Sequence, residues 1–183
     1  MSLPIELRID IRQWQAFIHR LGAQAVNRAF SRAVKKTSAW IITHTARRLA
    51  PALKIPVKVI KQRLMFYMRG VGGKVFFGFN PLKLHRLGKV RGIGAPARNG
   101  RPKGGLAAGR HRARDGWQMP KSIGAKSPIF RRSGAPRKPI ELSVLEWSAE
   151  AEAVFSQVAS EAEARLLVIF QQEINFELQR ATR

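Results

Sequence analysis

The stretch that decides the fold is residues 22–50, GAQAVNRAFSRAVKKTSAWIITHTARRLA. Its larger apolar side chains recur at helical spacing and share one face, namely Val26, Phe30, Val34 and Ile41. Small alanines flank this stripe, and basic residues occupy much of the remaining surface. The pattern predicts a long amphipathic helix, which we expect Pro51 to end because a proline disfavours helical backbone at the residue before it.

A second long helix is predicted over residues 148–180. Its apolar stripe comprises Phe155, Val158, Ala162, Leu166, Ile169 and Phe170. Carboxylates gather at its start, where they favour the positive end of the helix dipole. Glu173 and Glu177 near the other end lack that role, so we expect them to face a partner or water.

Shorter elements precede and follow the first helix. Residues 3–9 alternate apolar and polar side chains, which predicts an edge strand or extended arm. A short helix is expected over 11–20, and another over 56–63 that begins at a proline. Residues 64–69 and 73–79 are strand-like, and the glycines between them supply a turn.

Residues 87–116 are rich in glycine and basic residues and have neither a helical nor a strand period. We expect a long, flexible basic loop there, of the kind that is usually functional or disordered. Three apolar islands follow, at 116–119, 127–130 and 140–147. We expect them to be strands that continue the sheet begun by residues 64–79.

Together these elements predict one α+β domain over residues 1–183. Long N-terminal and C-terminal helices would pack on one face of a small, mostly antiparallel sheet, and the Gly/Arg-rich loop 87–116 would project from it. Residues 1–10 would form an extended arm. Apolar residues make up 45% of the chain, which is enough for a packed core.

The charge of the chain is large and segregated. Lysine and arginine number 34 against 11 acidic residues, for a formal net charge of +23. Residues 11–140 carry +29 and residues 141–183 carry −5. Two alternatives follow: the acidic helix meets the basic body of another protomer, or it packs on the body of its own chain. The candidate contacts between protomers are Arg28, Arg32, Lys35, Lys36, Glu161, Glu163, Glu173 and Glu177.

Several classes of protein are disfavoured by what the sequence lacks. There are no cysteines, so disulfides and thiol chemistry are excluded. The four histidines lie far apart without neighbouring ligands, which disfavours a metal site. Asp115 is the single acidic residue within 11–140, so this segment cannot supply the pair of carboxylates that general acid–base catalysis commonly uses. We therefore expect no enzyme activity and no cofactor. No signal peptide or membrane span is recognised, and we expect a soluble protein made in a cytoplasm.

Nucleic-acid contact is a separate possibility. Residues 74–79, KVFFGF, superficially resemble an RNA-recognition motif, although core aromatics on a half-buried strand explain them better. The basic loop could follow a phosphate backbone without reading sequence. Its candidate contacts to DNA or to a partner are Lys89, Arg91, Arg98, Arg101, Lys103, Arg110, Arg112 and Arg114. A free non-specific nucleic-acid-binding protein, ribosomal-like or architectural, is thus an alternative function.

Three short motifs in this order resemble a known family. The first is a basic helix, Ala23-Gln-Ala-Val-Asn27-Arg28-Ala-Phe-Ser-Arg-Ala33-Val. The second is Asp115-Gly116-Trp117-Gln118-Met119, and the third is Lys138-Pro139-Ile140-Glu141-Leu142, before a final helix. The chain resembles the minor tail protein Z (tail-completion) family of long-tailed phages, from which its acidic C-terminal helix departs.

The resemblance implies a structural role in the virion. Such a protein would act at the head-proximal end of the tail, in tail completion and head–tail joining, after assembly in the bacterial cytoplasm. It would form a homo-oligomer, with a ring expected, and dock to tail-terminator, tail-tube or connector proteins. Because the channel within such rings carries DNA, phosphate contacts to genomic DNA are also implied, and no membrane contact is.

Overall fold

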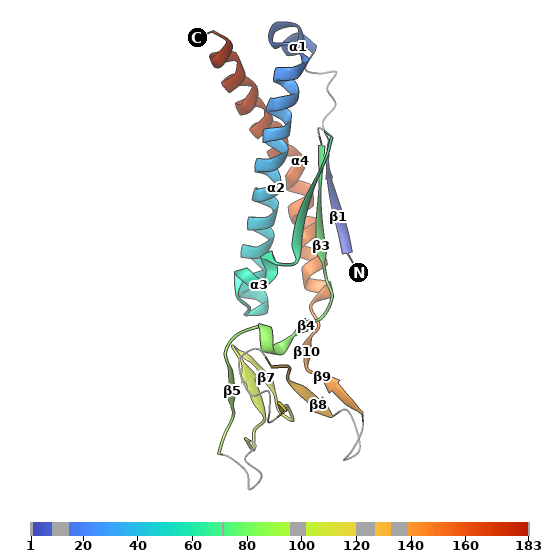
Figure 1. The fold of residues 1–183 in the computed structure, drawn as a ribbon, viewed down its shortest axis with the longest axis vertical. Coiled ribbons are helices and arrows are strands. Elements are labelled where there is room, and N and C mark those ends of the chain that lie inside the picture. Colours follow the sequence, from blue (N-terminus) through green and yellow to red (C-terminus); the bar gives the residue numbers. More distant parts are fainter. Residues whose placement is uncertain are drawn as a thin grey trace.

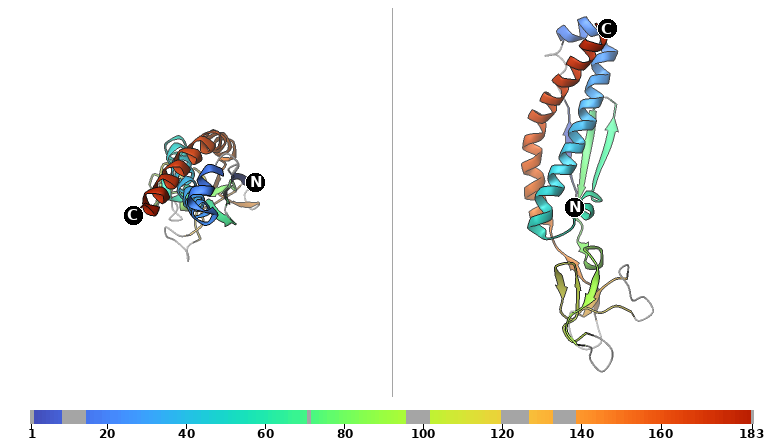
Figure 2. Two further views of the ribbon diagram at one scale, coloured as in Figure 1. Left: turned by 90° about the horizontal axis from the view of Figure 1, so that it is seen from above. Right: turned by 90° about the vertical axis from the view of Figure 1, so that its left-hand side faces the viewer.

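Two long helices form the spine of the molecule. The computed structural model describes residues 2–8, 15–70, 72–95, 102–119, 127–132 and 139–182. Helix α2 (Ala23–Leu53) and helix α4 (Ser148–Ala181) lie side by side in opposite directions (Figures 1 and 2). The predicted apolar stripes of both helices are buried, and the rings of Phe30 and Phe170 lie 5.6 Å apart, edge to face, where the helices meet. The two predicted long helices are therefore confirmed.

The end of α2 differs from the prediction, because Pro51 lies inside the helix rather than ending it. A proline removes one backbone hydrogen bond and sets its ring against the carbonyl four residues earlier, and here both costs fall in the last turn of the helix. The helix ends where Lys54 adopts a left-handed conformation with φ of 53°. The backbone N–H of Ile55 then donates to the carbonyl of Ala50, which closes the terminus.

A three-stranded antiparallel sheet lies along the helices. Its order is β1-β3-β2, formed by β1 (Ser2–Leu7), β2 (Leu64–Arg69) and β3 (Gly72–Gly78). Ile5 and Phe66 both lie opposite Val75 in the register, and β3 alternates buried and half-buried residues. Both long helices cover the same face of this sheet (Figure 1). The edge strand, the hairpin and the α+β class are as predicted.

The short helices complete this part of the molecule. Helix α1 (Gln15–Leu21) precedes α2, and helix α3 (Val57–Lys61) connects α2 to β2. We call the four helices with β1, β2 and β3 the helical body. Among the described residues, no helix combines the length and the apolar character needed to cross a membrane.

We call residues 80–145 the β region, and its described residues lie at one end of the helical body, opposite α1 and the end of α4 (Figure 1). A pair of strands, β4 (Leu82–Lys83) and β10 (Val144–Leu145), connects the two parts. Beyond it lies a sheet of order β5-β6-β7. Its strands are β5 (Val90–Gly92), β6 (Leu106–Ala108) and β7 (His111–Ala113). A further pair joins β8 (Phe130–Arg132) to β9 (Ile140–Leu142), and a 3-10 turn, η2 (Leu84–Arg86), follows β4.

The β region corrects two expectations. Segment 87–116 is not wholly a loop, because β5, β6 and β7 lie within it. The later apolar islands do not extend the main sheet; their strands form separate pairs. Strands of two or three residues are too short to show an alternating pattern, and β6 is buried throughout as Leu-Ala-Ala. The sequence pattern therefore did not reveal β5, β6 and β7, whereas strands were predicted around β8, β9 and β10 but with the wrong sheet partners.

Trp147 joins the β region to the helical body. Its side chain is fully buried, and its indole Nε1 donates a hydrogen bond to the carbonyl of Asn80, 3.0 Å away. Its ring lies edge to face against Phe77 at 5.4 Å, and Phe77 in turn lies 5.2 Å from Phe155 of α4. The chain segment that enters the β region and the segment that leaves it are thus held together at one aromatic cluster.

Gly73 tests how closely the sheet packs on α2. A β-carbon there would lie 2.5 Å from Cε2 of Phe66 and 2.8 Å from Cγ1 of Val34. We expect Gly73→Ala to lower the free energy of unfolding by about 1–3 kcal/mol, because overpacking displaces both neighbours. Urea unfolding measures this. Gly78→Ala in the same strand is the control, since its β-carbon would meet nothing closer than the Arg63 carbonyl at 3.9 Å. Equal stability of the two variants would show that Gly73 is not closely packed against Phe66 and Val34.

Candidate functional site

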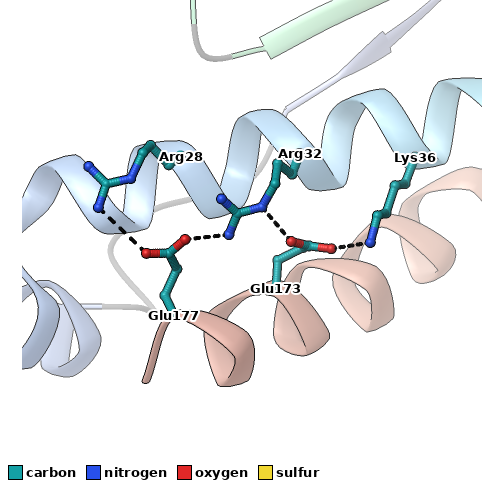
Figure 3. A network of polar contacts seen from close by, with 5 residues as sticks. All are labelled: Arg28, Arg32, Lys36, Glu173 and Glu177. Atoms are coloured by element: carbon teal, nitrogen blue, oxygen red, sulfur yellow. Dashed lines mark hydrogen bonds and ion pairs between the residues drawn. The ribbon is translucent and has the colours of Figure 1, made fainter. Parts of the chain in front are cut away.

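Five charged side chains connect α2 to α4 in one network (Figure 3). Arg32 is its centre, because Nε donates to Glu173 at 2.6 Å and one terminal nitrogen donates to Glu177 at 2.6 Å. Lys36 also donates to Glu173, and Arg28 lies 3.5 Å from Glu177. The two glutamates are 5% and 4% exposed, so their charges are compensated inside the protomer.

The network sets the ionisation of its carboxylates. Burial by itself raises the pKa of Glu173, but hydrogen bonds from Lys36 and Arg32 outweigh it, and the pKa lies below its ordinary value. The hydrogen bond from Arg32 lowers the pKa of Glu177 more than burial raises it. Both groups therefore stay ionised well into the acid range.

Arg48 and Glu161 form a second, separate link between the helices. Two guanidinium nitrogens of Arg48 donate to the two carboxylate oxygens of Glu161, each at 2.8 Å. This parallel geometry is the strongest form of an arginine–carboxylate pair. Hydrogen bonding from Arg48 lowers the pKa of Glu161.

These contacts bear directly on the residues predicted to join protomers. Arg28, Arg32, Lys36, Glu161, Glu173 and Glu177 are all paired within one chain. Of the two alternatives for the acidic helix, the structure has the intramolecular one. Lys35 and Glu163, the other two candidates, are exposed on the same helices. The sequence could not separate these cases, because a charge pattern does not say which chain supplies the partner.

The network makes stability dependent on acid pH. A carboxylate whose pKa is lowered by folding stabilises the protein above its unfolded pKa, about 4.3 for glutamate, and loses this effect as pH falls through the folded value. We therefore expect the free energy of unfolding to decrease as the pH is lowered from about 4.3. Glu173→Gln/Glu177→Gln should flatten this dependence in urea unfolding at pH 5 and pH 3. An unchanged slope in the double variant would show that other groups cause it.

The β region holds most of the uncompensated positive charge. Residues 80–145 contain 16 basic and two acidic residues, for +14 of the total of +23. Arg91 lies in β5, Arg112 lies in β7, and Lys103, Arg110 and Arg114 lie close to β6 and β7. Lys89 precedes β5, whereas Arg98 and Arg101 lie outside the described residues. Of the eight predicted contacts, two thus lie in short strands and four lie in the segments beside those strands.

A pocket of about 430 Å³ brings two of these residues together with others that the sequence analysis missed. Its lining includes Arg112, Arg114 and Asp115, in and just after β7, together with Arg131 and Arg132 of β8. Ser143, between β9 and β10, also lines it, as do Leu84, Ala113 and Val144. Arg131 lies 3.6 Å from Glu141, whereas no ion pair joins the other three arginines to a described carboxylate. No signal in the sequence places residues 112–114 beside residues 131–132.

Within the described ranges, no three histidine or carboxylate side chains lie close enough together to hold a metal ion. His85 is nearly buried, and burial together with Arg86 and Lys83 lowers its pKa.

Comparisons with family models, with curated proteins and with solved structures each find no match for the chain.

Proposed function

We propose that the protein is a structural component of a phage virion, at the head-proximal end of the tail, in tail completion and head–tail joining. It acts by self-association and docking rather than by chemistry. The three motifs that resemble the tail-completion family support this proposal. The elongated α+β fold, in which the helical body carries a strongly basic end, also suits an assembly role.

One observation carries the proposal most strongly, namely the division of charge. The acidic helix α4 partly neutralises α2 inside the chain, through Glu161, Glu173 and Glu177. The described part of the β region has little such compensation, since it holds ten basic residues against Asp115 and Glu141, and Glu141 lies beside Arg131. This end of the molecule therefore carries an excess of positive charge, which can meet acidic neighbouring proteins or the phosphates of DNA.

The central sheet offers a route to self-association. In the described part of the chain β1 and β2 are edge strands with no further strand beside them, and open edges can pair with another chain. Met65 and Tyr67 are 52% and 47% exposed on β2. Because the two edges differ, β1 of one copy would pair with β2 of the next, and such head-to-tail contacts generate rings when the rotation closes. Tail-terminator, tail-tube or connector proteins would dock to this assembly.

The test is a phage in which the coding sequence is interrupted. We expect tails to form that fail to join filled heads, and joining to return when the purified protein is added to the lysate. Infectious particles at normal yield without the protein would overturn the proposal.

A free nucleic-acid-binding protein is a second candidate, favoured by the four arginines that line one pocket of the β region. It requires submicromolar binding at physiological salt and a log–log salt slope of about −0.9 for each phosphate neutralised on duplex DNA. It also requires that the protein be missing from particles. Binding at low salt alone discriminates nothing, because any protein of this charge binds DNA there.

A further inference from the structure

We infer that the pocket between β7 and β8 is a binding site for a phosphoryl group. Four arginines line this one pocket, Arg112 and Arg114 from the segment of β7 and Arg131 and Arg132 from β8. Its volume of about 430 Å³ lies within the range of about 300–1,000 Å³ that is usual for ligand sites. The inference concerns the isolated chain and does not depend on where the protein assembles.

The hydroxyl of Ser143 is an independent observation that points to a ligand. Ser143 is 4% exposed and lines the pocket, and its Oγ has no hydrogen-bond partner among the described residues. A buried hydroxyl without a partner costs free energy, so such a group usually meets a ligand or water. An oxygen of a bound phosphoryl group would accept this hydrogen bond.

The backbone holds the lining residues in place. Ser143 donates its N–H to the carbonyl of Ile129 at 2.8 Å and accepts from the N–H of Leu84 at 3.0 Å. Trp117 and Phe130 exchange two backbone hydrogen bonds of 2.9 Å each, which ties the segment after β7 to β8. The site is therefore preorganised, and little ordering of its backbone opposes binding.

Close packing fixes the position of Arg114 as well. Gly105 has a φ of +78°, and a β-carbon there would lie 1.8 Å from the carbonyl oxygen of Arg114. Only glycine allows the start of β6 to approach the end of β7 this closely. This approach sets where the arginine leaves the sheet.

The chemistry of the lining favours a phosphoryl group over other ligands. Guanidinium groups bind phosphate oxygens through paired, charge-assisted hydrogen bonds, and several such groups can share the oxygens of one tetrahedral anion. Asp115 and Glu141 leave a positive excess, since Glu141 lies beside Arg131 alone. The phosphoryl group can belong to free phosphate or to a nucleic-acid backbone, and acidic side chains of a partner protein are the competing class.

The test measures binding of a labelled dodecathymidylate strand to the full-length purified protein at physiological salt, with inorganic phosphate as a competitor. Arg112→Gln/Arg132→Gln should weaken strand binding by about tenfold or more, since each lost charged hydrogen bond is substantial. The control, Arg91→Gln/Arg110→Gln, removes the same charge from exposed residues of the β region that do not line the pocket. It should weaken binding by less than about threefold.

Ser143→Ala separates a built site from a diffuse basic surface, because it keeps every charge. We expect it to weaken strand binding by about threefold to tenfold. Thermal unfolding of each variant shows whether the fold is retained. The four arginines replaced in the two double variants, Arg91, Arg110, Arg112 and Arg132, are all exposed, so the comparison of these two variants tests the site without Ser143→Ala.

The outcomes distinguish the sources of the phosphoryl group. Displacement of the strand by inorganic phosphate indicates that a free phosphoryl group is accepted; no displacement, with the pocket variant still weakened, indicates phosphodiesters. Both results support the site. Equal losses for the two doubles together with no effect of Ser143→Ala would overturn it. Displacement by a hexaglutamate peptide at a concentration at which phosphate fails would also overturn it, in favour of an acidic protein partner.

Discussion

Glu173→Lys is expected to lower the free energy of unfolding by at least about 3 kcal/mol. Glu173 is 5% exposed and accepts hydrogen bonds from Arg32 and Lys36. A lysine there would place a third positive charge between these two and leave Glu177 as the remaining carboxylate that pairs with Arg32. Because α2 and α4 form the spine of the fold, the loss should appear as a lower urea midpoint of the whole molecule.

Glu163→Lys is the matched control for this substitution. It makes the same change of charge on the same helix, but Glu163 is exposed. Exposed substitutions of this kind usually change the free energy of unfolding by less than about 0.5 kcal/mol. Adding Lys36→Glu to Glu173→Lys should recover part of the loss, since it restores opposite charges across the helices. If the two glutamate variants were equally stable, the network would not be what holds α4 to α2.

Trp147→Ala is expected to cost about 3–5 kcal/mol, the range for removal of a large buried aromatic side chain. The substitution removes the ring contact with Phe77 and the hydrogen bond that the indole donates to the Asn80 carbonyl. The pair β4–β10 lies next to this cluster, so its backbone amides should exchange hydrogen faster in the variant. Thermal unfolding and hydrogen exchange measure the two effects.

Trp147→Phe separates the ring from its hydrogen bond. It keeps an aromatic ring beside Phe77 and removes the indole N–H, so we expect a loss of about 1–2 kcal/mol. A loss as large as that of Trp147→Ala would show that the hydrogen bond to Asn80, rather than packing, joins the β region to the helical body.

The helical body could be predicted from sequence because its elements are long enough to show their periods. The apolar residues of α2 and α4 recur over many turns, and β3 alternates over seven residues. The β region could not be predicted in this way. Its strands have two or three residues, and their partners are distant in the chain, as for β4 with β10.

The candidate sites follow the same division. Arg112 and Arg114 were identifiable as basic residues, but their neighbours Arg131, Arg132 and Ser143 became recognisable only when the fold brought three segments to one pocket. The acidic helix was identifiable by its charge, yet only the register of α4 against α2 shows that Glu173 and Glu177 face Arg32 of the same chain (Figure 3). The composition indicates the sign of the charge that a partner must carry, and the fold determines which residue is that partner.

We propose that the protein is a stoichiometric part of a phage particle. Quantitative mass spectrometry provides the test, on purified tailed particles released from the bacterial strain that carries the coding sequence. We expect the chain at a constant copy number per particle, retained after washing at a salt concentration that strips non-specifically bound cationic proteins. Complete, infectious particles without the chain, with the protein left in the soluble lysate, would contradict the claim.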